Sequence, residues 1–244
     1  MKVVIIVQAR MTSTRLPGKV LLKVMDKPLL EYQIERLREV RAAEQVLIAT
    51  TINAADNEIV QLCKRLGVTF FCGSEHDVLD RYYQAAQASH ADVIVRITSD
   101  CPLIDPVVVD KVIGFYLDHP VYEYVTNCLP RTYPVGMDTE VFSFQALRIA
   151  HQEAVTGPDR EHVTGYIEQR PDRFCQANVA YKENHSRYRW TVDTPADFEL
   201  ISRIITTLYP GNHNFTLEDC LTLLAHNPEW EKINSHVKQK KYGE

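Results

Sequence analysis

The first half of the chain alternates short apolar runs with longer segments whose apolar residues recur at helical spacing. Apolar residues at every position indicate a strand buried on both faces, whereas a stripe at every third or fourth position indicates a helix. The pattern predicts strands at residues 2–7, 45–50, 69–71 and 92–97, and helices at residues 28–40, 56–66, 78–89 and 106–118. This alternation is typical of an α/β fold with a mostly parallel central sheet and helices on both faces.

The second half is less regular, and we expect mixed strand directions there. Its pattern predicts strands at residues 122–126, 138–142, 175–181 and 189–192, and helices at residues 144–154, 160–169, 196–209 and 217–225. Thr194-Pro195 supplies an N-cap and a first-turn proline for the helix at 196–209. We expect residues 1–244 to form a single domain, because this length suits one well-filled core.

Composition narrows the class of protein. Hydrophobic residues make up 45% of the chain and charged residues 24%, which is typical of globular proteins. A net charge of -5 argues against non-specific nucleic-acid binding, so any phosphate-binding cations must be concentrated locally. No stretch has membrane-spanning length, and the run at residues 3–7 is shorter than a signal peptide's apolar region. Six scattered cysteines fit reduced thiols, and we expect a cytoplasmic protein without a membrane partner.

The loop after the first strand concentrates positive charge. Its sequence, Gln-Ala-Arg-Met-Thr-Ser-Thr-Arg-Leu-Pro-Gly-Lys at residues 8–19, contains Arg10, Arg15 and Lys19 among three hydroxyl residues. Guanidinium groups and backbone amides both bind phosphate oxygens, so the loop predicts an anion site. It is not a Walker A motif, because it has one glycine and Val20 follows Lys19. A solvated surface loop is the alternative that charge count alone leaves open.

This string resembles the N-terminal signature of the cytidylyltransferases that make CMP-activated acidic sugars, most closely the SpsF-type spore coat polysaccharide proteins. The resemblance implies a GT-A-like (Rossmann-like) nucleotidyltransferase fold and a loop that grips the triphosphate of CTP. The implied nucleotide-binding residues of this loop are Gln8, Ala9, Arg10, Ser13, Arg15, Gly18 and Lys19.

Two further motifs place carboxylates at predicted strand ends. Asp100 follows the strand at 92–97, and Asp193 precedes the helix at 196–209. From the residues alone, such aspartates are often turn formers or helix caps. The resemblance implies that Asp100 and Asp193 bind Mg²⁺, with Mn²⁺ as an alternative. Asp105, before Pro106, fits a helix N-cap, and Asp197 fits a first-turn carboxylate.

The remaining motifs resemble the nucleoside and acceptor sides of the family's cleft. Asp77 and Arg81 either contact the nucleoside or belong to a capped helix start. We expect acceptor contacts from Arg131, Glu140, Arg160 and His162, and a polar contact from Asn127 at the end of a predicted strand. Among these, Arg131, Arg160 and His162 suit an acceptor carboxylate, although His162 fits an ordinary half-buried histidine equally well.

The resemblance therefore implies a cytidylyltransferase that converts CTP and a sugar acid to a CMP-sugar and pyrophosphate, for cell-surface or spore-coat polysaccharide. Arg10, Lys19 and Asp100 are its implied catalytic residues. Two alternatives stay open: a nucleotidyltransferase acting on a sugar 1-phosphate or other phosphorylated alcohol, and a non-catalytic nucleotide-sugar-binding protein. A homodimer is also open.

Overall fold

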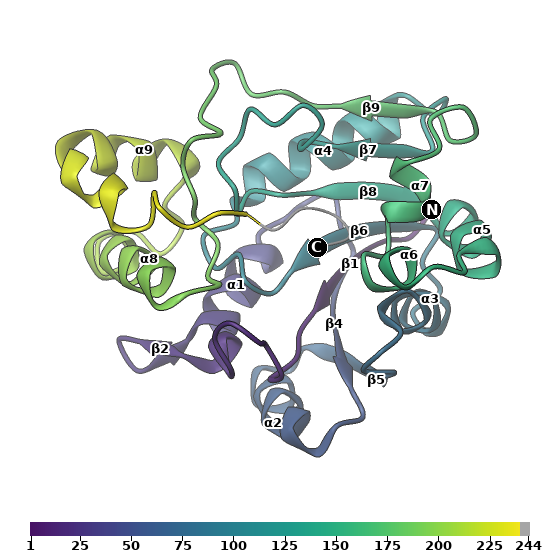
Figure 1. Ribbon diagram of the computed structural model, residues 1–244, viewed down its shortest axis with the longest axis horizontal. Helices are drawn as coiled ribbons and strands as arrows, with labels where there is room; N and C mark the ends of the chain where they lie inside the picture. The colour runs from purple at the N-terminus through teal and green to yellow at the C-terminus, as the bar shows by residue number, and fades with distance from the viewer. Residues whose placement is uncertain (240–244) are drawn as a thin grey trace.

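The centre of the computed structural model, which describes residues 1–239, is a seven-stranded sheet with the order β5-β4-β1-β6-β8-β7-β9 (Figure 1). Its strands are β1 (Val3–Gln8), β4 (Gln45–Thr51), β5 (Thr69–Gly73), β6 (Val93–Thr98), β7 (Tyr124–Thr126), β8 (Glu140–Ser143) and β9 (Gln176–Asn178). The first four strands in this order are parallel, β8 is antiparallel to β6 and β7, and β9 is parallel to β7. The predicted mostly parallel sheet with a mixed second half is confirmed.

Helices cover both faces of the sheet. One face packs against α1 (Leu29–Arg38), α2 (Asn57–Leu66) and α4 (Pro106–Asp118), and the other against α3 (Val78–Ala88), α5 (Phe144–Glu153) and α7 (Gly165–Glu168). The short helix α6 (Gly157–Glu161) packs against α3 and α7. Alternate residues of β1 enter different cores: Ile5 joins the first cluster and Ile6 the second. The continuous apolar run of β1 follows from this double coverage.

A third core lies beside the sheet rather than on either face. It joins Trp190 to α8 (Pro195–Leu208) and α9 (Leu217–His226), and the 3-10 helix η3 (Pro228–Ile233) packs against both helices. Figure 1 shows α8 and α9 next to each other, away from α3 and α5. Thr194 caps α8 as predicted, with Pro195 in the first turn. Within residues 1–239, no helix is long and apolar enough to cross a membrane.

A small hairpin precedes α1, which begins one residue later than predicted. The antiparallel strands β2 (Lys23–Val24) and β3 (Lys27–Pro28) are joined by Met25 and Asp26, whose φ angles are 51° and 65°. Positive φ at both turn residues is the geometry of a tight two-residue hairpin. Two further short 3-10 helices, η1 (Lys19–Leu21) and η2 (Ala54–Asp56), follow loops at the carboxyl edge of the sheet. Strands of two residues carry too little periodicity to predict.

Two predicted elements are wrong. The strand predicted at residues 189–192 is a loop with one isolated bridge, Val135 to Arg189, because Val192 N donates instead to Asp100 O at 2.8 Å. The helix predicted at residues 160–169 is divided into α6 and α7, because Val163 adopts a φ of 57°, which a helix cannot contain. The single domain over residues 1–244 stays a prediction, and residues 240–244 lie outside the described part of the chain.

The turn at Gly136 provides a test of its close approach to the backbone of Trp190. Gly136 has a φ of 107°, and a Cβ there would lie 2.6 Å from Trp190 O. We expect Gly136→Ala to lower the free energy of unfolding by at least about 3 kcal/mol, because strain and a backbone clash add. Gly67→Ala is the control, with a φ of 61° and nothing within 4 Å of its added Cβ, and should cost only about 1 to 2 kcal/mol. Equal losses in urea titrations would contradict the predicted clash.

Candidate active site

A cleft of about 300 Å³ opens at the carboxyl ends of β1 and β6, where parallel α/β sheets bind their ligands. The loop after β1 forms one wall of the cleft and the end of β6 forms another. Its lining residues are Gln8, Ala9, Arg10, Ser13, Thr14, Arg15, Lys19, Val78, Arg81, Arg96, Thr98, Ser99, Asp100, Glu161, His162 and Asp193. The cation-rich loop and the carboxylates Asp100 and Asp193 thus face the same space.

Two acidic residues that the sequence patterns did not single out hold the loop. Met11 N donates to Asp56 Oδ1 at 2.7 Å, and Thr12 Oγ1 donates to Glu75 Oε1 at 2.7 Å. The loop closes where Gly18 N donates to Met11 O at 2.9 Å, with Gly18 in the left-handed region at a φ of 69°. Gly18 therefore shapes the turn that delivers Lys19 to the cleft and does not itself line it.

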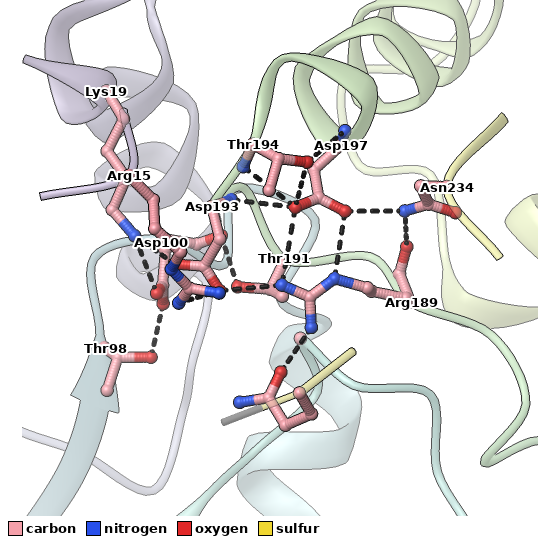
Figure 2. A network of polar contacts seen from close by, with 12 residues as sticks. Arg15, Lys19, Thr98, Asp100, Arg189, Thr191, Asp193, Thr194, Asp197 and Asn234 are labelled. Atoms are coloured by element: carbon pink, nitrogen blue, oxygen red, sulfur yellow. Dashed lines mark hydrogen bonds and ion pairs between the residues drawn. The ribbon is translucent and has the colours of Figure 1, made fainter. Parts of the chain in front are cut away.

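Asp100 and Asp193 meet at Lys19, although 93 residues separate the two aspartates in the sequence. Lys19 Nζ lies 3.0 Å from Asp100 Oδ2 and 2.8 Å from Asp193 Oδ1 (Figure 2). The backbone enforces this approach, because Val192 N and the Thr191 hydroxyl both donate to Asp100 O, at 2.8 and 3.2 Å. The segment at residues 189–192, which was predicted as a strand, is thus the loop that brings Asp193 close to Asp100.

Positive charge surrounds Asp193. Besides Lys19, Arg15 Nη2 lies 2.9 Å and Arg189 Nη2 2.7 Å from its Oδ2 atom. Burial alone would raise the pKa of Asp100, but the charge of Lys19 and hydrogen bonds from Thr98 and Lys19 outweigh it and lower this pKa to about 2. Burial likewise opposes the charge of Lys19, and the two aspartates raise its pKa. Asp100 and Lys19 are therefore both charged at neutral pH.

The residues expected to contact nucleotide divide into two groups. Gln8, Ala9, Arg10, Ser13, Arg15, Lys19 and Arg81 line the cleft. Asp77 does not line it: its side chain caps α3 by accepting from Asp80 N at 2.8 Å, and it pairs with Arg160, whose Nε lies 3.0 Å from Asp77 Oδ2. The capped helix start that the sequence left open is therefore present.

The residues expected to contact the acceptor are also divided. His162 lines the main cleft, where burial lowers its pKa. Arg131 and Glu140 line a second cavity of about 360 Å³ that shares Arg96 and Thr98 with the first. Arg160 and Asn127 line neither cavity. Asn127 is buried, and its amide group is used within the chain, donating to Met137 O at 2.7 Å and accepting from Thr139 N at 2.9 Å.

The two converging carboxylates fit a hard divalent cation. No group of three or more histidine, cysteine, aspartate or glutamate residues forms a metal site within residues 1–239. Magnesium, however, needs only one or two protein carboxylates when phosphate and water oxygens complete its octahedron. Asp100 and Asp193 supply such a pair beside a cation-rich loop.

The geometry agrees with the outcome of comparison with known proteins. A family model described as "Cytidylyltransferase" matches residues 4–226. The chain belongs to the cytidylyltransferase family. It is therefore a nucleotidyltransferase enzyme, and the resemblance found in the opening loop is confirmed.

Several known proteins are similar to this cytidylyltransferase over most of its length. An uncharacterized protein of Methanocaldococcus jannaschii is 40% identical over 100% of this chain and 99% of its own. The spore coat polysaccharide biosynthesis protein SpsF of Bacillus subtilis is 32% identical over 93% of this chain and 95% of its own. The solved structure of a cytidylyltransferase from Leptospira borgpetersenii is 34% identical, covers 99% of both chains and superposes with a TM-score of 0.91.

A more distant structure shares the fold alone. The structure of a CMP:2-keto-3-deoxy-manno-octonic acid synthetase complexed with CTP is 19% identical and has a TM-score of 0.64. It covers 84% of this chain and 99% of its own. The nucleotidyltransferase fold predicted from the sequence is confirmed by these two structures.

Among residues 1–239, three buried polar atoms around the cleft of this cytidylyltransferase lack a hydrogen-bond partner, which a ligand would supply. Gln8 Oε1, Arg81 Nε and Arg96 Nε have no hydrogen-bond partner within the described part of the chain. Buried polar groups are nearly always hydrogen-bonded, so unpaired atoms around one cleft point to a polar ligand. Arg96 was not anticipated, although a charged residue inside the apolar strand β6 was a readable signal.

Glu168, which the sequence analysis also missed, lies in the second cavity beside Glu140. Tyr124 Oη lies 2.7 Å from Glu140 Oε1 and 2.8 Å from Glu168 Oε1. Glu140 also pairs with Arg96, and it accepts from Thr164 Oγ1 at 2.6 Å. Burial, followed by the charge of Glu140, raises the pKa of Glu168 from 4.5 to about 7. The second cavity therefore contains a carboxyl group that is half-protonated near neutral pH.

This raised pKa predicts how stability depends on pH. The folded protein binds the Glu168 proton more tightly than the unfolded chain, so the contribution is complete below pH 4.5 and is lost as pH rises to about 7. We expect Glu168→Gln to flatten the wild-type decline in unfolding free energy across this window, measured by urea titration. Glu153→Gln is the control, since the pKa of Glu153 is lowered to about 2, outside the window. Unchanged slopes in Glu168→Gln would refute the assignment.

Proposed function

We propose that the protein transfers the CMP group of CTP to a sugar acid and releases pyrophosphate, for the biosynthesis of a cell-surface or spore-coat polysaccharide. The observation that carries this proposal is the convergence of a cation-rich loop and two carboxylates on one cleft of a cytidylyltransferase. A hydroxyl oxygen of the acceptor forms a bond to the α-phosphorus, the bond from this phosphorus to the β-phosphate oxygen breaks, and the hydroxyl proton leaves to solvent.

The loop residues bind and orient the triphosphate. Arg15 and Lys19 are attached to Asp193, whereas Arg10 forms no ion pair among residues 1–239 and is available to phosphate. Neutralising and fixing the leaving group supplies electrostatic stabilisation and positioning, which account for most of the catalysis in phosphoryl transfer. Asp100 and Asp193 would hold a Mg²⁺ or Mn²⁺ ion, which would supply charge neutralisation at the phosphates.

The second cavity is the acceptor side in this proposal. It adjoins the nucleotide cleft through Arg96 and Thr98, so a bound acceptor can reach the α-phosphate. Arg131 offers a guanidinium to an acceptor carboxylate, in exchange for its present partner Asp138. The synthetase of similar fold is named for an acidic sugar, which supports this acceptor class.

A sugar 1-phosphate is a poorer fit to the same cavity. Both of its arginines are already matched by carboxylates, Arg96 by Glu140 and Arg131 by Asp138, and Glu168 adds a third acidic group. A dianionic phosphate would meet this acidic excess with twice the charge of an acceptor carboxylate, and so with stronger repulsion. The ion cluster at Lys19 likewise argues against a protein that only binds nucleotide sugars, because binding alone does not require paired carboxylates.

Two observations support the biological setting. The relative from Bacillus subtilis is named for spore coat polysaccharide biosynthesis, which supports a role in surface polysaccharide. All six cysteines are free thiols, as expected of a protein in the reducing cytoplasm.

Pyrophosphate release tests the reaction. With CTP and Mg²⁺ or Mn²⁺, we expect release in the presence of a sugar acid from a panel and none with sugar 1-phosphates. Asp100→Asn and Asp193→Asn should each lower turnover by at least about 10²-fold, the scale for loss of one electrostatic stabiliser. Circular dichroism controls for folding. Turnover confined to sugar 1-phosphates would replace the proposed acceptor, and wild-type turnover in a folded Asp100→Asn protein would remove that residue from the site.

Arg10 provides a test of triphosphate binding without metal. We expect Arg10→Ala to weaken CTP binding in EDTA by about 1.5 to 3 kcal/mol, the range for hydrogen bonds to charged groups, with a smaller loss for CMP. Arg203→Ala is the charge-matched control, because Arg203 lies on the exposed side of α8 and pairs with Glu199. Calorimetric titration measures both affinities. Equal losses in Arg10→Ala and Arg203→Ala would mean that only net charge matters.

A further inference from the structure

Arg189 is a buried arginine between two aspartates of the loop and helix that follow it. Its Nη2 lies 2.7 Å from Asp193 Oδ2, and its Nε lies 2.9 Å from Asp197 Oδ1 (Figure 2). The side chain of Arg189 is 7% exposed and that of Asp197 is 0% exposed. A planar guanidinium held at two edges cannot rotate without breaking a charged hydrogen bond. The position of the Asp193 carboxylate is therefore tied to the first turn of α8.

Asp197 holds Asp193 in two ways. Its Oδ2 atom accepts from Asp193 N at 3.1 Å and from Thr194 N at 3.0 Å, as part of the capping box of α8. Its Oδ1 atom accepts a hydrogen bond from Arg189 Nε, and Arg189 Nη2 in turn donates to the Asp193 side chain. Backbone and carboxylate of Asp193 are thus fixed by the same residue, directly at the amide and through Arg189 at the side chain.

The segment after η3 completes the arrangement from the other end of the chain. Asn234 is 2% exposed, and its Nδ2 donates to Asp197 Oδ1 and to Arg189 O, both at 2.8 Å. Gln239 accepts a further hydrogen bond from Arg189 Nη1. Asn234 belongs to no recognised nucleotide motif, yet one amide group joins the two residues that fix Asp193.

We propose that Arg189 is a positioning residue that aims Asp193 for metal-dependent triphosphate binding, and that Asn234 holds Arg189 in this orientation. Arg189 binds Oδ2 of Asp193, which leaves Oδ1 on the side of Lys19 and Asp100. Arg15 also contacts Oδ2 and Lys19 contacts Oδ1, but both belong to the loop that binds triphosphate in the proposed function. When that loop engages the phosphates, Arg189 is the contact that keeps the carboxylate from rotating its oxygens away from Asp100. This inference rests on the proposed function, because it assumes that Asp100 and Asp193 act together on metal and triphosphate.

Two variants remove the restraint while keeping the proposed metal ligands. Arg189→Lys keeps the positive charge but loses the fork that bridges both aspartates, and Asn234→Ala removes the amide while leaving the ion pairs. Arg36→Lys is the control for the first variant, since Arg36 is also buried but donates to Ile104 O, Leu103 O and Phe215 O. It measures the cost of losing a buried guanidinium elsewhere.

A third variant separates helix capping from positioning. Asp197 and Asp219 occupy the same position in two capping boxes, with Thr194 and Thr216 as their partners, but only Asp197 binds an arginine. Asp197→Asn and Asp219→Asn should therefore lose similar capping free energy. We expect only Asp197→Asn to affect the metal-dependent readout.

The readout is calorimetric CTP affinity in Mn²⁺ and in EDTA, with thermal unfolding of each free protein. In Mn²⁺, Arg189→Lys, Asn234→Ala and Asp197→Asn should each bind CTP at least about 10-fold more weakly, as for residues that orient a metal ligand. In EDTA their affinities should change less than about 3-fold, a fraction of that effect. Both controls should keep wild-type affinity in Mn²⁺.

The outcomes separate this inference from the proposed function. Wild-type protein that binds CTP equally in Mn²⁺ and EDTA would overturn the metal role of Asp100 and Asp193, and with it the positioning role. Wild-type tightening by Mn²⁺ that persists in Arg189→Lys and Asn234→Ala would overturn the positioning role alone. Equal losses in Mn²⁺ and EDTA would also overturn it, because a purely structural defect predicts that result.

Discussion

Lys19 supplies the positive charge that allows the poorly solvated carboxylates of Asp100 and Asp193 to lie close together. Asp100 and Asp193 would repel each other at this separation, and burying either without a partner would be costly. The ammonium group between them, with Arg15 and Arg189 on the outer oxygen of Asp193, balances this cost. The shape of the opening loop, the turn at Gly18 and the contact of Val192 with Asp100 all serve to bring these charges together.

The fold was predictable where sequence and local structure agree. The β-α alternation gave seven of the eight predicted strands and most helices within a few residues, because β1, β4 and β6 are apolar on both faces. The segment at 189–192 has strand-forming residues, yet its hydrogen bonds go to Val135 and Asp100. Tertiary contacts override local propensity there, and no pattern within the segment reveals it. Val163 breaks a helix by a backbone angle that its residue type disfavours.

The sequence predicts the site residues that belong to motifs, but not the contacts that connect those residues to the rest of the fold. The loop residues, Asp100 and Asp193 were recognisable by sequence pattern, and the structure gathers them in one cleft. The ion-pair partners of Asp77 and Arg131 were not recognisable in the sequence, because each ion pair depends on which elements pack together. Arg189 and Asn234 illustrate the same limit, since their link spans 45 residues and exists only after α8 and η3 have packed.

The distance along the chain between Lys19 and Asp193 has a consequence for the order of folding. The contact spans 174 residues, and Asn234 closes the arrangement later still in the sequence. Contacts between distant segments require closure of long loops and form late when nearer pairings are available. The central strands β1, β4 and β6 can therefore assemble before the charges at their carboxyl ends are balanced. Formation of this cluster of ion pairs then reports that the whole described chain, and not only its sheet, has reached the native state.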